Sequence, residues 1–303
     1  NGLIEEAREC YRHVLSQEPN QPLLRLRVNS LCTPVFMNNQ AIQEYRNGLK
    51  KSIDDVAKEL NELEDKPLDL RRLHASRLDP PLLLAYQGDD DRPIKEAWSS
   101  LFEKQLPKIG FNLHTSRLGK PHIGIVVTRG HEGIFIRGMG GILEKLSTKY
   151  FDITVVCTSQ GGVATLRPSI KNAAIHYLSL PERIDLAVKL LAEAQFQLLY
   201  FWEVGTDSIN YFIPFFQLAS VQCTGWGWPV TSGIPQMHYY LSNQYLEVGD
   251  SNSYYSEQLV KFRRLPTYFL RPEHPKVPMD REKLGLAKGQ HLYLCVQNLR
   301  KIH

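Results

Sequence analysis

The sequence predicts an α/β protein with a Rossmann-like, doubly wound parallel sheet, preceded by an α-helical region. Residues 123–128, Ile-Gly-Ile-Val-Val-Thr, form an unbroken apolar run rich in β-branched residues, which is typical of a strand buried on both faces. From Pro121 onward, similar runs alternate with helical patterns of the length that connects parallel strands. Before Pro121 the apolar residues follow helical spacing.

The composition is that of an ordinary globular protein. The 303 residues are enough for two domains, and 43% hydrophobic with 22% charged residues is a usual balance. The net charge of +4 is small and is not gathered in one stripe, which argues against a nucleic-acid partner. No stretch approaches the ~20 apolar residues of a transmembrane helix, so no membrane partner is expected.

The cysteines predict neither a disulfide framework nor a metal site. They are odd in number, widely spread and never spaced as a metal-ligand pair, and three of them lie in apolar runs that are expected to be strands. This pattern favours buried, reduced thiols and a cytoplasmic protein. The five are Cys10, Cys32, Cys157, Cys223 and Cys295.

Residues 1–20 are expected to contain one helix. Ala7, Tyr11 and Val14 share a helical face, and Pro19 ends the pattern. The order of small and aromatic positions resembles the second helix of a tetratricopeptide repeat, although an ordinary amphipathic helix explains it as well. No second copy follows at a period of about 34 residues, so the segment is predicted to be the last helix of an array that lies upstream.

Residues 21–118 are predicted to form a helical linker region. Helices are expected at 39–64 and 93–106, with a stiff apolar link at 80–86. An acidic triplet at 89–91 precedes the second of these helices and lies outside any strand-to-helix turn. It is therefore expected to cap that helix in a solvated loop, not to bind a metal.

The region after Pro121 is predicted to alternate strands and helices. Right-handed crossovers between such strands place all their carboxyl ends, and with them the ligand crevice, at one edge of the sheet. Strands are expected at 123–128, 153–158, 174–178, 197–201, 221–224, 237–242 and 292–296, and helices at 134–150, 166–172, 182–194 and 207–216.

The turn after the first strand is the first candidate site. Gly130 and Gly133 permit a tight turn and a close approach of the backbone to a ligand, and the amides that open the next helix can bind an anion. His131 could accept a proton from an attacking hydroxyl, or it could be a turn histidine bonded to a neighbouring loop. The glycine spacing, and the lack of an acidic residue after the second strand, argue against a dinucleotide site.

Glu203 comes just after the fourth strand, at the same predicted edge of the sheet. It could orient His131 or an acceptor. Thr206 or Asp207, a few residues later, is expected to cap the next helix.

A loop at 225–233 is the second candidate site, because it combines two tryptophans with glycines and adjacent hydroxyls. Aromatic faces stack on sugars or bases, and hydroxyls and amides can bind a phosphate or an acceptor. A packed corner between strands is the alternative. The residues expected to line this site are Trp226, Trp228, Thr231, Ser232 and Gly233.

Asn298 and Lys301 follow the last predicted strand. Amide and cationic side chains suit a diphosphate leaving group, although a surface lysine near a chain end is an equally simple interpretation.

Four segments together resemble the catalytic region of O-GlcNAc transferases and SPINDLY-like glycosyltransferases that carry tetratricopeptide repeats, in their bacterial form. They are residues 123–139, residues 222–240 with Pro-Val-Thr-Ser-Gly at 229–233, residues 255–260 and residues 292–302. Their order and spacing are more specific than any single motif.

This resemblance implies a GT-B architecture, in which two Rossmann-like lobes enclose the active site. Residues 119–290 would form the amino-terminal lobe, and residues 291–303 would begin the carboxy-terminal lobe. The implied reaction transfers N-acetylglucosamine from UDP-GlcNAc to Ser or Thr hydroxyls of proteins, with inversion and with no metal or other cofactor. SPINDLY-type relatives use GDP-fucose. The upstream repeats would bind the protein substrates.

The resemblance also implies roles for individual residues. His131 lies near the family's histidine of the first turn, although the local spacing differs, and residues 231–233 match a loop that lines the site. Asn298 and Lys301 match an amide and a lysine that hold the donor diphosphate, the amide being Gln in most relatives.

Three positions depart from the family pattern. Gln197 stands where many relatives have a histidine, His238 where an Asp is usual, and Val230 where Gly is common. Two alternatives therefore stay open: a non-catalytic scaffold with a degenerate lobe, and a transferase that uses another nucleotide sugar or a glycan or lipid acceptor. Because the sequence starts inside a helical pattern and ends after a predicted strand, it is expected to be a fragment without transferase activity of its own.

Overall fold

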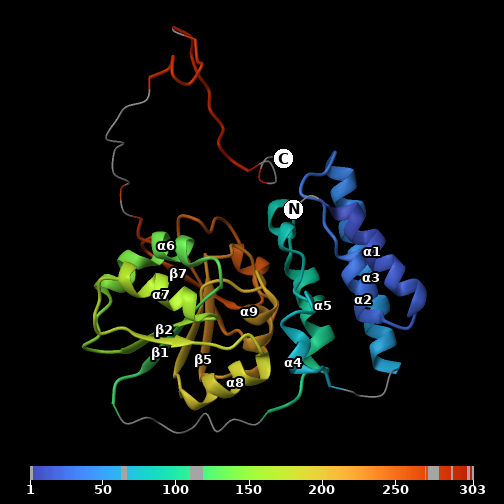
Figure 1. The fold of residues 1–303 in the computed structure, drawn as a ribbon, viewed down its shortest axis with the longest axis horizontal. Coiled ribbons are helices and arrows are strands. Elements are labelled where there is room, and N and C mark those ends of the chain that lie inside the picture. Colours follow the sequence, from blue (N-terminus) through green and yellow to red (C-terminus); the bar gives the residue numbers. More distant parts are fainter. Residues whose placement is uncertain are drawn as a thin grey trace.

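The computed structural model describes residues 3–62, 67–109, 119–269, 271, 280–287, 289–298 and 301. Within them, a group of helices precedes an α/β lobe (Figure 1). Helices α1, α2 and α3 lie on one side of α5, and the sheet lies on its other side. The helices before the sheet are α1 (Ile4–Gln17), α2 (Pro22–Asn29), α3 (Asn39–Glu62), α4 (Leu70–Leu73), the 3₁₀ turn η1 (Leu82–Tyr86) and α5 (Arg92–Glu103).

The amino-terminal helix is confirmed as a helix. In α1 the side chains of Ala7 and Tyr11 are half-buried, but Val14 is exposed. Its place in a tetratricopeptide array stays a prediction. Helix α2 was not predicted, because its eight residues are too few for a clear apolar period; Pro22 at its first turn supplies the fixed φ angle that suits a helix start.

The sheet confirms the predicted fold class. Its seven strands are all parallel and lie in the order β3-β2-β1-β4-β5-β6-β7. The chain winds outward from β1 to β3 and then returns to β4, so the topological switch point lies between β1 and β4. The strands are β1 (His122–Val127), β2 (Asp152–Cys157), β3 (His176–Ser179), β4 (Leu198–Phe201), β5 (Val221–Gly225), β6 (Tyr239–Asn243) and β7 (Gln258–Phe262).

Helices cover both faces of this sheet and divide its apolar side chains into two cores. Along β1, Val126 belongs to the core beneath α8 and α9, whereas Ile125 and Val127 belong to the core beneath α6 and α7, as the alternation of a strand requires. The helices of the lobe are α6 (Glu132–Lys145), α7 (Gln160–Ser169), α8 (Ile184–Glu193), α9 (Ser208–Phe212), η2 (Ile213–Phe216) and η3 (Ser251–Tyr254).

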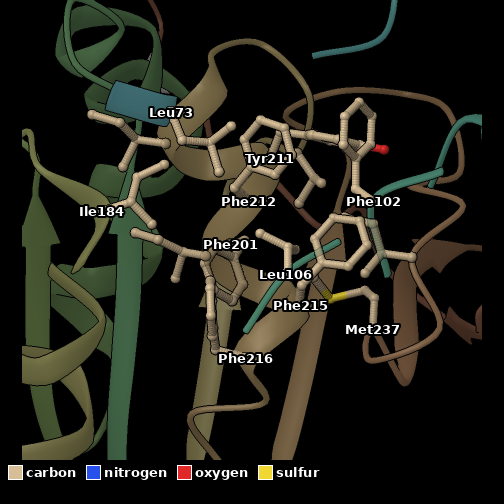
Figure 2. Packing of buried hydrophobic residues seen from close by; sticks show 14 of the residues in the cluster. Leu73, Phe102, Leu106, Ile184, Phe201, Tyr211, Phe212, Phe215, Phe216 and Met237 are labelled. Atoms are coloured by element: carbon tan, nitrogen blue, oxygen red, sulfur yellow. The ribbon is translucent and has the colours of Figure 1, made fainter. Parts of the chain in front are cut away.

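Helix α5 contributes to the larger of these cores (Figure 2). The ring of Phe102 meets Phe212 edge to face at 5.2 Å and Tyr211 at 6.4 Å. Trp98, one turn earlier, is fully buried and donates its indole N–H to the carbonyl of Leu78. The segment before the sheet is thus packed into the lobe through contacts between α5 and α9.

The chain that leaves β7 returns across the lobe to α6. Tyr268 donates its backbone N–H to the carbonyl of Gly138 at 2.8 Å, and its ring lies where a Cβ at Gly141 would stand. Lys145 lies over that ring at 4.3 Å and donates to its hydroxyl. Gly138 and Gly141 of α6 therefore form a surface on which the segment after β7 rests.

Several predicted elements differ from the structure for identifiable reasons. The strand predicted at 292–296 is wrong, because those residues are exposed and pair with no strand among the described residues, while β7 occupies the edge of the sheet. The helix predicted at 207–216 is divided into α9 and η2, because Pro214 at the start of η2 has no N–H with which to continue the α-helical hydrogen bonds. Helix α7 starts earlier than predicted, where Ser159 accepts from the amide of Gly162 at 2.9 Å.

The cysteine prediction is partly correct. Cys32, Cys157 and Cys223 are buried free thiols, but Cys10 and Cys295 are exposed. Cys295 was expected to be buried only because a strand was expected around it. Among the described helices, none is long and apolar enough to cross a membrane.

Candidate active site

The carboxyl ends of β1 and β4 bring His131 and Glu203 together. His131 directly precedes α6, and Glu203 comes two residues after the end of β4. The imidazole Nδ1 and the carboxylate Oε2 are 2.5 Å apart. Glu203 is 3% exposed, whereas the His131 side chain is 36% exposed. A buried acid thus holds one nitrogen of a partly exposed imidazole at the switch point of the sheet.

The hydrogen bond to Glu203 raises the pKa of His131 above its usual value, although burial acts in the opposite direction. The nearby carboxylates of Asp207 and Glu132 add to the increase. Because Nδ1 is engaged by Glu203, Nε2 is the nitrogen able to take a proton from a ligand. His131 and Glu203 are therefore arranged as a general base and the acid that orients it.

Three further polar side chains lie behind this pair. Thr206 donates to Glu203 Oε2 at 3.2 Å, and its hydroxyl oxygen is 3.2 Å from that of Thr128. Asn210 donates from Nδ2 to the Thr128 hydroxyl at 3.0 Å. Thr128 and Asn210 were not singled out in the sequence. Thr128 could have been found, since it directly follows β1, but the place of Asn210 depends on where α9 begins.

The helix-capping prediction near Glu203 is confirmed. Asp207 precedes α9 and accepts from the backbone N–H of Asn210 at 2.7 Å. Burial raises the pKa of Asp207, and hydrogen bonds from Asn210 oppose that effect.

The glycine-containing turn between β1 and α6 is arranged around the carboxylate of Glu132. Gly130 has φ +81°, in the region that favours glycine, and its N–H donates to Glu132 Oε1 at 3.1 Å. Cys157 lies 3.6 Å from the same oxygen. Gly133 lies in the first turn of α6 with open space at its Cβ position. The amide of Gly130, expected to bind the donor, thus has an internal partner.

The tryptophans of the second candidate site lie in two different environments. Trp228 is buried and meets Tyr86 edge to face at 5.8 Å, and Lys301 lies over the same Tyr86 ring at 5.5 Å. Trp226 is half-buried and faces Phe269 at 6.4 Å. Tyr86 thus joins Trp228 to Lys301, although its own segment was expected to be only a stiff link.

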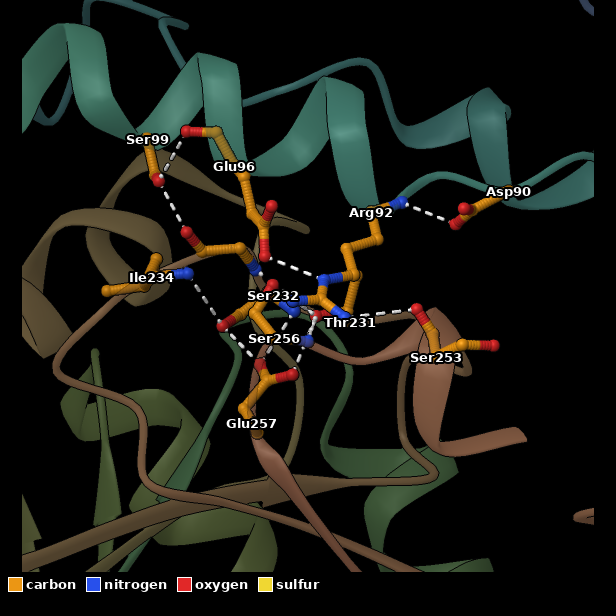
Figure 3. Close-up of polar contacts among 11 residues, drawn as sticks. Asp90, Arg92, Glu96, Ser99, Thr231, Ser232, Ile234, Ser253, Ser256 and Glu257 are labelled. Carbon is orange, nitrogen blue, oxygen red and sulfur yellow. Dashed lines mark hydrogen bonds and ion pairs between the residues drawn. The ribbon is translucent and has the colours of Figure 1, made fainter. Parts of the chain in front are cut away.

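The hydroxyls of Thr231 and Ser232 are directed to Glu257 (Figure 3). Thr231 donates to Oε2 at 2.6 Å, and Ser232 contacts Oε1 through both its hydroxyl and its backbone N–H. Both residues are 2% exposed. Glu257 lies in a segment that carries the family resemblance, but its role could not be foreseen because it is distant in sequence.

Gly233 holds the same loop against α5. It has φ +73°, and a Cβ there would overlap the backbone of Lys95. Its carbonyl accepts a hydrogen bond from Ser99 on α5. Within the described residues, no hydrogen bond joins this loop to His131, so the two candidate sites are separately built.

A cavity of about 270 Å³ lies beside this loop, between it and the residues that precede α5. The acidic triplet forms part of its wall, but Arg46 binds Asp91 at 2.8 Å and Asp89 at 3.5 Å. Asp90 accepts from the N–H of Arg92 at the start of α5, in agreement with the predicted capping role, but the prediction of a solvated loop is wrong for Asp91, which is buried against Arg46. In the part of the chain that the structure covers, no group of three or more His, Cys, Asp or Glu could hold a metal ion.

Two departures from the family pattern lie away from the carboxyl edge. Gln197 precedes β4 and accepts from the N–H of His122 at 2.6 Å. His238 precedes β6 and accepts from the N–H of Gln222 through Nδ1 at 2.9 Å. Both side chains therefore fasten the opposite, amino-terminal edge of the sheet, and neither takes part in the His131 pair.

Comparison with known proteins finds a solved structure with a similar fold, but no similar sequence. No family model matches the sequence, and no curated protein does. Among solved structures, a lysine-to-methionine mutant of the O-GlcNAc transferase of Thermobaculum terrenum is similar, with a TM-score of 0.52 and 14% sequence identity. The match covers 88% of this chain and 49% of that one, so the present chain spans about half the length of that structure.

Proposed function

We propose that this chain is the amino-terminal catalytic lobe of a glycosyltransferase that transfers a sugar from a nucleotide-sugar donor to a hydroxyl group. The single observation that carries the proposal is the pairing of His131 with buried Glu203 at the switch point of a parallel sheet, where ligands of such folds bind. Similarity of fold to an O-GlcNAc transferase adds to it.

The proposed chemistry needs one proton transfer and one displacement. His131 Nε2 takes the proton of the acceptor hydroxyl as its oxygen attacks the anomeric carbon. The bond from that carbon to the diphosphate oxygen breaks, the configuration inverts, and the nucleoside diphosphate leaves with the electron pair. Glu203 stabilises the imidazolium that forms, and no metal or further cofactor takes part in the proposal.

In this proposal the nucleotide-sugar donor binds next to the aromatic pair of Tyr86 and Trp228. Lys301, over the Tyr86 ring, supplies a positive charge for the departing diphosphate, and Asn298 supplies an amide donor. Trp226 offers a half-buried aromatic face for a sugar. Thr231 and Ser232, whose hydroxyls bind Glu257, would shape the site through the backbone of their loop.

The finer proposal is that the donor is UDP-GlcNAc and that the acceptors are Ser or Thr residues of proteins, selected by a tetratricopeptide array before α1. It rests on the sequence resemblance and on the name of the similar structure. GDP-fucose is the alternative donor. Since a donor site in GT-B enzymes needs two lobes, the 303-residue chain by itself is expected to be inactive.

The test is mass spectrometry of acceptors after the full-length protein has been incubated with UDP-GlcNAc, GDP-fucose and a cell lysate. Transfer of one sugar is expected, with a loss of at least about 100-fold on His131→Gln, because general base catalysis contributes that much. Gln197→Ala, at the other edge of the sheet, is the matched control and is expected to keep activity. Absence of transfer with either donor would contradict the proposal and favour a binding scaffold.

A further inference from the structure

We infer that Thr206, Thr128 and Asn210 are positioning residues that act through Glu203 to hold His131 in the tautomer that carries its proton on Nδ1. This inference rests on the proposed function, since the tautomer matters for catalysis only if His131 is the base. The residues come from three places in the chain, which are the end of β1, the loop after β4 and helix α9.

The donor and acceptor of each hydrogen bond in this network follow from the carboxylate of Asp207, which lies at one end of it. Asp207 Oδ2 can only accept when ionised, so the Asn210 group that faces it at 3.0 Å must be the amide Nδ2. Asp207 also accepts from the Asn210 backbone N–H, as an ionised carboxylate does. The second N–H of the same amide is therefore directed to Thr128.

The hydroxyls of Thr128 and Thr206 then each have only one consistent assignment as hydrogen-bond donor and acceptor. Thr128 accepts from Asn210, so its own proton is free to be donated to Thr206. Thr206 accepts that proton and donates its own to Glu203 Oε2. If Thr206 were to donate to Thr128 instead, Glu203 would lose this donor, and the proton of Thr128 would have no partner in this network.

This arrangement of donors and acceptors determines which nitrogen of the His131 imidazole carries the proton. Glu203 Oε2 accepts from Thr206 on one side and faces His131 Nδ1 on the other at 2.5 Å. A carboxylate held as an acceptor requires a proton on Nδ1, and Nε2 is then unprotonated in the neutral ring. Because Glu203 is 3% exposed, water cannot easily replace a donor that is removed.

The test is an NMR titration of the 303-residue chain, with ¹⁵N shifts that report the pKa and the tautomer of each imidazole. A His131→Asn chain identifies the His131 signals among the ten histidines. In the unaltered chain, the neutral ring is expected to carry its proton on Nδ1. Thr206→Val removes one donor from the carboxylate, which then binds the imidazolium more strongly, so the pKa of His131 should rise by about half a unit.

Two further variants separate positioning from packing. Thr206→Ser keeps the hydroxyl and is expected to titrate like the unaltered chain. Thr128→Val should raise the pKa by a smaller amount, and its effect should disappear in a Thr206→Val background, because the two groups act in series. A Thr206→Val chain that titrates like the unaltered one, or a serine variant that shifts as much as the valine variant, would overturn the inference.

The outcome is distinguishable from that of the proposed function. If the full-length protein transfers no sugar but the variants titrate as expected, the hydrogen-bond order stands and the catalytic role fails. If sugar is transferred and the titrations do not differ, only the inference fails. Where both hold, the pH profile of transfer should move with the His131 pKa in Thr206→Val.

Discussion

Lys95 is a cation held almost wholly away from water. It lies on the buried side of α5 with 1% exposure, and a Cβ at Gly205 would be 3.6 Å from its ammonium. None of the ion pairs found among the described residues includes it. Burial lowers the pKa of Lys95 to about 8, although the carboxylates of Asp91, Asp79 and Glu257 oppose this effect.

This burial predicts how stability depends on pH. Between pH 8 and about 10.5 the unfolded chain keeps a proton on Lys95 that the folded chain has lost, so this residue makes stability increase as pH rises. Lys95→Met removes that contribution. Between pH 7.5 and 9.5, the free energy of unfolding should therefore rise relative to the variant by on the order of 1–2 kcal/mol. Urea denaturation of both proteins measures the difference.

The comparison with the variant is necessary because other groups titrate in the same range. Burial raises the pKa of Cys157 to about 11, which makes stability fall as pH increases above the pKa of an unfolded thiol. Both proteins share that effect, and it cancels in the difference. A difference that stays constant with pH would show that Lys95 is not desolvated.

For single residues, the sequence predicts which side chains lie at the ends of strands. It does not predict which residues far apart in the sequence form hydrogen bonds with each other. His131 and Glu203 could be placed together because each follows a strand that was visible as an apolar run. The partners of Thr231 and Ser232 could not be predicted, because Glu257 reaches them from the start of β7, a strand whose pattern is only half apolar. Exposed hydroxyls and buried ones look the same in a sequence.

Among the elements, α5 is predicted to stabilise the lobe through one aromatic side chain. Phe102 is fully buried between Phe212 and Tyr211, so Phe102→Ala leaves a cavity. The free energy of unfolding should fall by about 3–5 kcal/mol, measured by denaturant titration. Ser100→Ala, exposed on the same helix, is the control and should change it by less than about 0.5 kcal/mol. A loss below about 1 kcal/mol for Phe102→Ala would contradict the packing.

Long apolar elements were predicted well, and short or interrupted ones were not. The strands from β1 to β6 lie within a few residues of their predicted bounds, and four of them, β1, β2, β4 and β5, are mostly buried, as their apolar runs predict. The segment at 292–296 is as apolar as those strands, but a strand forms only where a neighbour accepts its hydrogen bonds. Apolar composition alone could not reveal that no described strand pairs with this segment.

Over the whole molecule, a buried ion pair fastens α3 to the loop that precedes α5, the helix packed into the lobe. Arg46 on α3 binds Asp91 at 2.8 Å, with both side chains less than 10% exposed, and it also donates to the carbonyl of Asp90. Arg46→Met would leave Asp91 buried without its cation, which should lower the free energy of unfolding by about 3–5 kcal/mol. Denaturant unfolding measures the loss.

The matched control removes both charges. In an Arg46→Met, Asp91→Leu double variant neither member of this buried pair is left without the other, so the loss should be smaller than in Arg46→Met alone. If the double variant were the less stable of the two, attraction between the charges would not be what holds α3 to this loop.

The order of strands was foreseeable, and the position of the first helices was not. Alternating strands and helices allow few parallel topologies once crossovers are right-handed. The ion pair that joins α3 to the loop before α5 links Arg46 to Asp91, which lies 45 residues later in an acidic triplet that looked solvated in the sequence.

Helix α6, which follows His131, is a poor helix by composition. Four of its fourteen residues are glycines, each of which disfavours an isolated helix by about 1 kcal/mol relative to alanine. One of them, Gly141, leaves the room that the ring of Tyr268 fills. The helix that follows the proposed base is therefore covered by a segment that lies more than a hundred residues later in the chain.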